Sequence, residues 1–504
     1  MRRLAVADLG SNSFRLVVYA YEPGRWWAHA DEIREAVRIS AGMGGDGKLR
    51  KEPMRRALRT AEVFDAFCRS TGIEAVEAVA TSAIRDASNR DDLLRAIAER
   101  TALPVRVLST SEEARYGYLA IVNSTTLADG YGIDIGGGSV QLMRVEDRRL
   151  TADASWPMGA VRMSERFLPG GESGAKALKA LRKHVAAELV DTDWLASGGG
   201  SRLVGIGGTI RNLAAAAERE AGVDHPDAQG YVLTRDALGA LIETFAGMPP
   251  AKRGRVPGIK PDRGDVILGG AAVIAAVMDE VGFAELEVTE AGLREGVFFE
   301  HFLGDEEEPL LPDVRRGSVE NLAGRYQDDL EHPRHVAALS LQVFDGLVDA
   351  GLYEPGAADR ELLWAACLLH DVGVVVDYDD HHKHSRYLIL NAGLPGFTPR
   401  EVELIALVAR YHRKGDPDVS AMGQLAKKRD AERLSVLAGT VRLAEQLERS
   451  RDGSVRRVSL RAENGRVVVR ADASPDAEVA IWSARRNADL LAGAIDREVE
   501  IESP

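Results

Sequence analysis

The chain has little cysteine and no long hydrophobic run. Cys68 and Cys367 are its only two cysteines among 504 residues, which excludes a disulfide framework and indicates a reducing compartment. The longest apolar stretch, VILGGAAVIAAVM from Val266, is too short to span a bilayer and is typical of a buried helix. At the N-terminus, Asp8 interrupts the apolar run too early for a signal peptide. These absences predict a soluble, cytoplasmic protein with no membrane partner.

Positive charge is also scarce. Lysine and arginine number 64 against 78 aspartates and glutamates, which gives a net charge of −14. This balance argues against general nucleic-acid binding and against attraction to an anionic membrane surface. Any anionic ligand must therefore be held by local groups, such as backbone N–H donors or individual arginines. At this length, three or four domains are expected.

Strands and helices alternate along the first 303 residues. Apolar runs that end in glycine-containing turns are followed by amphipathic helical patterns. This alternation predicts an α/β fold. The next segment, GDEEEPLLPDVRRG at 304–317, carries an acidic run and two prolines, and predicts a domain boundary.

The pattern changes after this boundary. Nearly every segment of 318–449 has a helical pattern, which predicts an all-α domain. Residues 455–504 return to strands, and the Asn-Gly pair at 464–465 between alternating runs is a strong hairpin signal. We therefore expect a small α+β domain at the C-terminal end.

An internal repeat links two distant parts of the α/β region. DLGSNSFRL (8–16) and DIGGGSVQL (134–142) share the frame D-[L/I]-G-x-x-S-x-x-L, which predicts two similar domains. Glycines let the backbone approach a ligand closely, and their N–H groups can point at phosphate oxygens. A third turn, GIGGTIRN from Gly205, enters a helix whose N-terminus favours an anion. Three such turns, two with a matched aspartate suited to hydrated Mg²⁺, predict phosphate binding.

Glu113 has two interpretations. Thr110 stands three residues before it at a helix start, which is a capping-box pattern. Near a phosphate site, the same carboxylate would act as a general base on water. Spacing alone favours capping, and both roles stay open at this point.

The first 303 residues resemble the exopolyphosphatase/guanosine pentaphosphate phosphohydrolase (Ppx/GppA) family. The matching motifs are DLGSNSFRL, ATSAIRDASN, LSTSEEAR, GIDIGGGS, GIGGTI and GLREG, in this order. The resemblance implies two actin-like (ASKHA, RNase H-like) lobes, 1–125 and 126–303, with the last helix packing back on the first lobe. It also implies processive, Mg²⁺-dependent hydrolysis of the terminal phosphoanhydride of inorganic polyphosphate, or of pppGpp, with Mn²⁺ as an alternative metal.

The resemblance also assigns roles to matching residues. It implies that Glu113 is the general base, that Asp134 binds the metal with Asp8 opposite, and that Arg85 contacts phosphate. The implied phosphate cradle consists of Gly10, Ser11, Asn12, Ser13, Gly136, Gly137, Gly138, Ser139, Gly207, Gly208 and Thr209. Gln141 departs from the family, which usually has glutamate there. A neutral amide keeps an acceptor and adds donors, so we expect a working site with weaker metal affinity or a changed metal preference.

Without the resemblance, Arg85 would be interpreted as a surface ion pair with Asp86 or Asp91. A small-molecule kinase and a non-catalytic sensor of polyphosphate or (p)ppGpp are further alternatives. The TSAIR and SEEAR stretches favour the phosphatase over the kinase, whereas Gln141 would suit the sensor. By resemblance to the long-form exopolyphosphatases, the helical extension implies the long polymer rather than pppGpp as substrate.

The helical region 318–449 resembles an HD domain, a metal-phosphohydrolase fold. The candidate metal ligands are His335, His370, Asp371, His384, His412 and Glu445. Imidazoles and carboxylates on neighbouring helices suit divalent metals, although Glu445 stands where the pattern has aspartate. The main expectation is an accessory domain that shapes a polyphosphate channel and a homodimer. Positive charge at Lys427, Lys428, Arg429, Arg413 and Lys414 would track a polyphosphate chain, and the alternative is that these residues form a solvated helix face. His381 and His382 are expected in a solvated loop.

Overall fold

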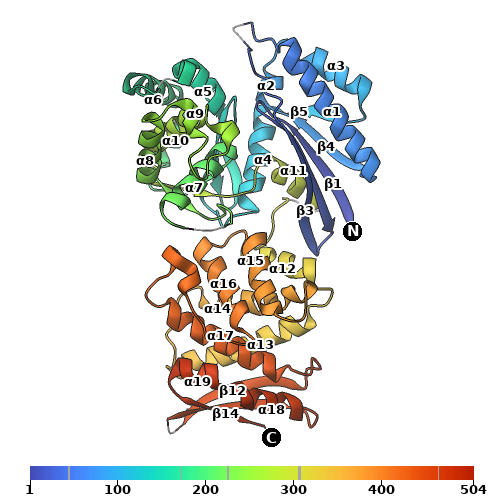
Figure 1. Cartoon of the computed structure of the whole chain (residues 1–504), viewed down its shortest axis with the longest axis vertical. Coiled ribbons are helices and arrows are strands. Elements are labelled where there is room, and N and C mark those ends of the chain that lie inside the picture. Colours follow the sequence, from blue (N-terminus) through green and yellow to red (C-terminus); the bar gives the residue numbers. More distant parts are fainter. Residues whose placement is uncertain (44–45, 172, 224–225, 305–307, 464, 504) are drawn as a thin grey trace. The chain divides into compact units, whose positions relative to one another are not determined.

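The structure is a computed structural model that describes the chain except residues 44–45, 172, 224–225, 305–307, 464 and 504 (Figure 1). It divides into two compact units. The N-terminal unit comprises Met1–Ala221 and Ala228–Val314, and the C-terminal unit comprises Gly222–Asp227 and Arg315–Pro504. The finer division predicted from the sequence, into 1–125, 126–303, 318–449 and 455–504, stays a prediction.

The first sheet of the N-terminal unit has the strand order β3-β2-β1-β4-β5. Its strands are β1 (Arg2–Leu9), β2 (Phe14–Glu22), β3 (Trp26–Glu35), β4 (Ala75–Ala80) and β5 (Val105–Val107). The first three form an antiparallel meander, and β4 and β5 add to β1 in parallel. Side chains of three helices contribute to its hydrophobic core: α1 (Lys51–Thr71), α2 (Ser82–Arg85) and α3 (Arg90–Arg100).

The second sheet has the order β10-β11-β9-β6-β7-β8 and repeats this plan. Its strands are β6 (Gly130–Ile135), β7 (Val140–Glu146), β8 (Arg149–Trp156), β9 (Leu203–Ile206), β10 (Val232–Thr234) and β11 (Glu285–Val288). An antiparallel meander, β6-β7-β8, is again joined by parallel strands, β9 next to β6 and β11 next to β9. The two copies of the repeat therefore occupy equivalent places, the β1–β2 and β6–β7 connections.

Helices of the second sheet include α5 (Ala160–Phe167), α6 (Ala175–Leu189), α7 (Gly208–Glu220), α8 (Arg235–Ala246), α9 (Pro250–Arg253) and α10 (Ile267–Val281). The apolar run from Val266 forms α10, whose Leu268 and Ile274 are fully buried, as predicted. Among the described residues, no helix is both long and apolar enough to cross a membrane.

Two helices share a core with strands of both sheets: α4 (Thr110–Val122) and α11 (Leu293–Phe302). They pack closely, because a side chain added at Gly296 would overlap the backbone of Tyr116. From α11, Phe298 stacks on Tyr19 of β2 with ring centroids 4.4 Å apart, and Glu295 accepts a 2.6 Å hydrogen bond from the Tyr19 hydroxyl. The last helix of this unit is thus fixed to the first sheet.

The C-terminal unit combines helices with a small sheet of order β12-β13-β14. Its main elements are α12 (Val314–Tyr326), α13 (Glu331–Asp349), α14 (Asp359–Leu369), α15 (His381–Ala392), α16 (Pro399–Tyr411), α17 (Asp430–Leu447), β12 (Val455–Glu463), β13 (Arg466–Ala473), α18 (Glu478–Arg486), α19 (Asp489–Ile495) and β14 (Glu498–Glu502). Strands β12 and β13 form the expected antiparallel pair, whereas Asn464 of the predicted turn lies outside the described residues.

Helices and strands of this unit share one hydrophobic core. A methyl group added at Gly346 of α13 would lie 2.7 Å from the Leu460 side chain of β12. Likewise, one added at Gly439 of α17 would lie 2.9 Å from the Leu491 backbone of α19. The helices therefore pack directly on the C-terminal strands and helices.

Candidate functional site

The two repeat turns of the N-terminal unit meet. Ser11, in the β1–β2 turn, lies 3.2 Å through its hydroxyl from the Ser82 hydroxyl at the start of α2. A methyl group added at Gly138, in the β6–β7 turn, would lie 2.6 Å from that Ser82 hydroxyl, and one at Gly137 would lie 3.2 Å from Ser11 Cβ. These turns approach so closely that a side chain at 138 would require the Ser82 hydroxyl to move.

The third turn, after β9, lies against Asp134. A Cβ added at Gly207 would lie 2.8 Å from Asp134 Oδ1, and φ there is +101°, a conformation that favours glycine. Two residues on, the buried Thr209 hydroxyl has no hydrogen-bond partner among the described residues. A helix N-terminus with an unsatisfied buried hydroxyl suits an anionic ligand.

Three acids lie beneath these turns. Asp8 is near the end of β1, Asp134 near the end of β6, and Glu113 in the first turn of α4. Burial, together with the negative charges of Glu113 and Asp8, raises the pKa of Asp134 to about 7. Burial also raises the pKa of Glu113 and of Asp8. A cation would relieve this mutual repulsion.

Oxygen ligands of this kind fit Mg²⁺, which binds one or two carboxylates and retains several waters. Among the described residues, the three acids do not form a set with all ligand atoms within 4.8 Å of one another. Asp8 and Asp134 would therefore hold the ion together with water and ligand oxygens rather than as a closed protein cage.

Arg85 faces the acids. It ends α2, and its Nη1 lies 2.6 Å from Glu113 Oε2 and donates at 3.1 Å to the Leu108 carbonyl. Both side chains are largely buried, at 14% and 9% exposure. Asp86, its alternative partner from the sequence, lies farther away at 3.7 Å. Arg85 is thus mainly an internal partner of Glu113.

The predicted capping role of Glu113 with Thr110 is wrong. The N-cap of α4 is Ser109, whose hydroxyl accepts the Glu112 N–H at 3.2 Å, while Glu112 accepts the Ser109 N–H at 2.8 Å. The helix begins one residue earlier than expected, so the capping box uses the preceding glutamate. This leaves Glu113 free to face inward. The S-x-x-E spacing of Ser109 and Glu112 was a signal that could have identified the box.

Gln141 lies among the acids. It stands directly opposite Asp134 in the β6–β7 pairing and is only 1% exposed. Its amide donates to the Ser139 hydroxyl at 3.3 Å, and the interaction of Gln141 with the Glu113 carboxylate lowers the Glu113 pKa, partly offsetting the effect of burial. Position 141 therefore influences the predicted base directly.

Sequence reasoning missed a set of basic residues around these turns, which we call the basic cluster. Its members are Arg15, Arg211, Lys260, Arg263 and Arg294. Arg294 lies 3.6 Å from Asp8, and the Arg263 guanidinium lies 2.8 Å from a Cβ added at Gly208. Burial and neighbouring guanidinium groups lower the pKa of Lys260 and of Arg263. Arg211 lies in the GIGGTIRN motif and Arg294 in the GLREG motif, whereas no motif of the sequence includes Lys260 or Arg263.

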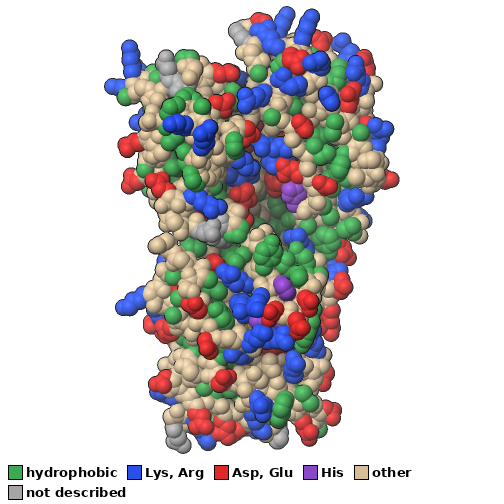
Figure 2. Space-filling view, in the orientation of Figure 1, with side chains coloured by type: hydrophobic (Ala, Val, Ile, Leu, Met, Phe, Trp, Pro, Cys, Tyr) green, Lys and Arg blue, Asp and Glu red, His purple; other side chains and the backbone are tan. Residues whose placement is uncertain are grey.

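On the face drawn in Figure 2, Lys and Arg side chains alternate with acidic ones over the N-terminal unit. The basic cluster is therefore a local feature of an acidic protein. Cations that lower one another's pKa gain from a shared anion, so the cluster suits a ligand with several phosphates.

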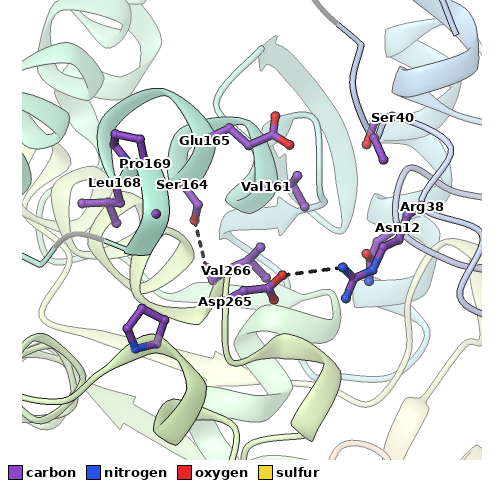
Figure 3. A pocket seen from close by; sticks show the side chains of 13 residues that line it. Asn12, Arg38, Ser40, Val161, Ser164, Glu165, Leu168, Pro169, Asp265 and Val266 are labelled. Atoms are coloured by element: carbon purple, nitrogen blue, oxygen red, sulfur yellow. Dashed lines mark hydrogen bonds and ion pairs between the residues drawn. The ribbon is translucent and has the colours of Figure 1, made fainter. Parts of the chain in front are cut away.

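A pocket of about 340 Å³ lies beside the first turn (Figure 3). Asn12, Arg38 and Ser40 line one side, and residues of α5 with Asp265 and Val266 line the other. Arg38 and Asp265 approach to 3.9 Å across it. This pocket offers room for a group larger than phosphate next to the first turn.

The C-terminal unit brings together most of the predicted metal ligands. His370, Asp371, His412 and Glu445 are buried, and Glu445 Oε2 lies 3.1 Å from His370 Nε2. His332 and His381 complete the set, in which His332, His370 and Asp371 form one group and Asp371, His381 and His412 form another.

Besides Glu445, which contacts His370, two predicted ligands lie outside these groups. His335 instead contacts the Val455 carbonyl at 2.8 Å, and His332, one turn earlier on the same face of α13, takes its place. His381 takes the place of His384 because α15 begins at residue 381. The expectation of a solvated loop for His381 and His382 is wrong, since they are 5% and 0% exposed in the first turn of this helix.

Comparisons with known proteins agree with this architecture. Residues 17–304 match the Ppx/GppA phosphatase family, and residues 314–472 match Ppx/GppA phosphatase domain III. A solved Ppx/GppA family member from Aquifex aeolicus is 26% identical over 61% of this chain and 99% of its own, with a TM-score of 0.53. An exopolyphosphatase structure from Cytophaga hutchinsonii matches 60% of this chain and 98% of its own, at 22% identity and a TM-score of 0.56.

The match to the first model spans more than half of the chain. It confirms the expected actin-like fold with mixed sheets in the N-terminal half and a helical region after it. The fold and the family model agree, and the chain belongs to the Ppx/GppA phosphatase family.

Proposed function

We propose that the N-terminal unit is an exopolyphosphatase, which hydrolyses the terminal phosphoanhydride of inorganic polyphosphate. The observation that carries this proposal is the buried Arg85–Glu113 pair at 2.6 Å, placed beside Asp134 beneath three glycine-rich turns. Phosphoryl transfer to water needs neutralised charge and an oriented nucleophile more than it needs covalent catalysis. The turns and Arg85 would neutralise the phosphate charge, and Glu113 would orient the water that attacks.

In this mechanism, backbone N–H groups of the turns and the Thr209 hydroxyl bind the terminal phosphate. Glu113 holds a water through the carboxylate oxygen that does not contact Arg85. The water oxygen attacks the terminal phosphorus, the bond from phosphorus to the bridging oxygen breaks, and the shortened chain leaves with that electron pair. The water proton passes to Glu113, whose raised pKa favours accepting it.

Other residues of the chain stabilise charge. Arg85 faces the oxygens of the transferred group and orients Glu113. Mg²⁺ held by Asp134 and Asp8 would neutralise the phosphate oxygens. The basic cluster favours a substrate whose negative charge continues beyond the terminal phosphate, which supports the polymer.

One observation favours pppGpp as a second candidate substrate. The pocket beside Asn12 has about 340 Å³, and a cleft of this size accommodates a small organic group. Both substrates present a terminal phosphoanhydride, so the same turns and the same base would act on either.

The test is phosphate release from long-chain polyphosphate and from pppGpp, with Mg²⁺ and then Mn²⁺. Glu113→Gln is expected to lower kcat by about 100-fold or more, because it removes the base, while binding of polyphosphate is retained. Glu112→Gln is the matched control, since it changes the neighbouring helix-capping glutamate and is expected to keep the rate. Binding of both substrates without phosphate release by the unmodified protein would instead identify a sensor.

A further inference from the structure

The histidine–carboxylate cluster of the C-terminal unit plays no part in the proposed reaction. It consists of His332, His370, Asp371, His381, His412 and Glu445. In one group, ligand atoms of His332, His370 and Asp371 lie within 4.8 Å of one another, and in the other those of Asp371, His381 and His412 do so. Asp371 is common to both groups and can therefore offer one oxygen to each.

Three of these imidazoles are oriented by the backbone. The Nδ1 atoms of His370, His381 and His412 lie 2.5, 2.8 and 2.7 Å from carbonyl oxygens three residues earlier in the chain. A carbonyl oxygen only accepts, so each neutral ring carries its proton on Nδ1 and donates it there. The Nε2 lone pair of each ring then faces the cluster, which is the arrangement found in metal-ligating histidines.

The lone pairs converge on shared points. His381 Nε2 and His412 Nε2 are 3.1 Å apart, and Asp371 Oδ1 lies 3.2 Å from His381 Nε2. Two acceptor nitrogens at this distance repel each other unless a cation lies between them. Adjacent ligands of an ion bound at about 2.0–2.2 Å are roughly 3 Å apart, so the observed spacing fits metal coordination.

Glu445 completes the first group in spite of its longer side chain. Its Oε2 lies 3.1 Å from both His332 Nε2 and His370 Nε2. Both imidazole nitrogens of the buried His332 otherwise have no well-formed hydrogen bond among the described residues. The extra methylene of glutamate therefore still brings the carboxylate to the ligand nitrogens.

A guanidinium group lies at the edge of the cluster. Arg451 follows α17, and its Nη2 lies 2.6 Å from Asp371 Oδ2. Its side chain is 55% exposed, so it can move into solvent. It neutralises the Asp371 oxygen that a bridging carboxylate would need.

We propose that the C-terminal unit binds two divalent transition-metal ions, bridged by Asp371, and that their binding displaces Arg451 from this carboxylate. His332, His370 and Glu445 complete the first site, and His381 and His412 the second. Mixed imidazole and carboxylate ligands suit Mn²⁺, Fe²⁺, Co²⁺ or Zn²⁺. Six protein ligands leave open positions on two such ions, to which water or a phosphate-type oxyanion can bind beside the released Arg451.

The first experiment measures cobalt binding to the full chain after removal of metals by chelation. Excess Mg²⁺ is present to occupy oxygen-only sites, and bound Co²⁺ is counted by elemental analysis and by its visible absorption. The unmodified protein and the control His384→Gln are expected to retain two Co²⁺ per chain, His412→Gln one, and Asp371→Asn none or one. No retained cobalt in the folded unmodified protein, or full binding by Asp371→Asn, would overturn the proposal.

The second experiment uses two exposed arginines near the end of α17, where substitution preserves the fold. Arg451→Ala is expected to raise Co²⁺ affinity about threefold or more, because the metal no longer competes with an ion pair. Arg449→Ala removes the same charge from a residue outside the cluster and is expected to leave the affinity unchanged. Equal affinities for the two variants would refute displacement of Arg451. The test does not depend on polyphosphate hydrolysis, so it stands apart from the function proposed for the N-terminal unit.

Discussion

At the scale of single residues, Gln141 removes a negative charge from a place where buried acids already repel one another. It faces Asp134 across the β6–β7 pairing and lowers the pKa of Glu113. A glutamate there would add a carboxylate to the ligand oxygens, and the number of charged ligands is a main determinant of affinity for hard cations.

Gln141→Glu is therefore expected to increase Mg²⁺ affinity about tenfold, which corresponds to roughly 1.4 kcal/mol, because it adds a charged oxygen ligand. The same change should destabilise the metal-free protein, because a further acid is buried beside three others. Isothermal titration with Mg²⁺ and the Mg²⁺ dependence of phosphate release measure the first effect. Gln141→Met, uncharged and of similar size, is the control, and equal Mg²⁺ affinity in both variants would place position 141 outside the metal's environment.

Single residues were also where prediction from sequence was weakest. Glu112 and Glu113 are neighbours, and a shift of one residue in the helix start decides which of them caps α4. His332 and His335 lie one turn apart on α13, so helical spacing gives both the same face. In each case the pattern predicts the correct helix, whereas the choice between adjacent side chains depends on packing that only the folded chain determines.

At the scale of elements, the turn at Gly138 is constrained by contact with α2. Gly138→Ala is expected to reduce phosphate release by about tenfold or more, because the added methyl group would lie 2.6 Å from the Ser82 hydroxyl and would displace the turn. Gly174→Ala is the control, since a methyl group there meets no atom within 4 Å. The double variant Gly138→Ala/Ser82→Gly should recover part of the activity, and full activity in the single variant would show that the turn tolerates a side chain.

A second element-level feature is the attachment of α12 to α14 and α16 through Arg315. Its guanidinium lies 2.8 Å from Glu361 and 2.9 Å from Glu401. Burial alone would raise the pKa of Glu401, but hydrogen bonds from Arg315 and from the Thr398 backbone outweigh it and lower the pKa. The ionised form of Glu401 is thus favoured in the folded protein.

Because the folded-state pKa of Glu401 is depressed, its stabilisation is present above the unfolded-state pKa and is lost as pH falls through the folded-state pKa. Glu401→Gln is expected to reduce the stability of the C-terminal unit by about 1–3 kcal/mol at pH 7. The difference from the unmodified protein should shrink in acid, where both side chains are neutral. Urea unfolding at pH 7 and at low pH measures this, and a difference independent of pH would exclude the ion pair as its source.

The elements themselves were largely predictable. The repeated D-[L/I]-G-x-x-S frame identified two equivalent strand-turn-strand connections, because glycine turns and alternating apolar runs depend on local chain geometry. The basic cluster was not predictable as a unit, since Lys260 and Arg263 reach the third turn through tertiary packing and carry no periodic pattern.

At the scale of the whole molecule, the two units have separate hydrophobic cores. Two unfolding transitions are therefore expected in calorimetry. Leu437→Ala, in α17, and Leu268→Ala, in α10, remove fully buried side chains, and each should cost about 2–5 kcal/mol. Each variant is expected to lower the melting temperature of a different transition, whereas a common shift of both transitions would mean that the units unfold together.

Because the helices and strands of the C-terminal unit share one hydrophobic core, metal bound at the cluster should also stabilise the C-terminal strands. His332 lies on α13, which packs on β12, and Glu445 lies on α17, which packs on α19. His335 of α13 also contacts the Val455 carbonyl of β12 directly. Loading the cluster with Co²⁺ should therefore slow amide hydrogen exchange in β12 and β13, which carry none of the proposed ligands. A fragment ending after α17 would lose this coupling, and with it the apolar surface that covers α13.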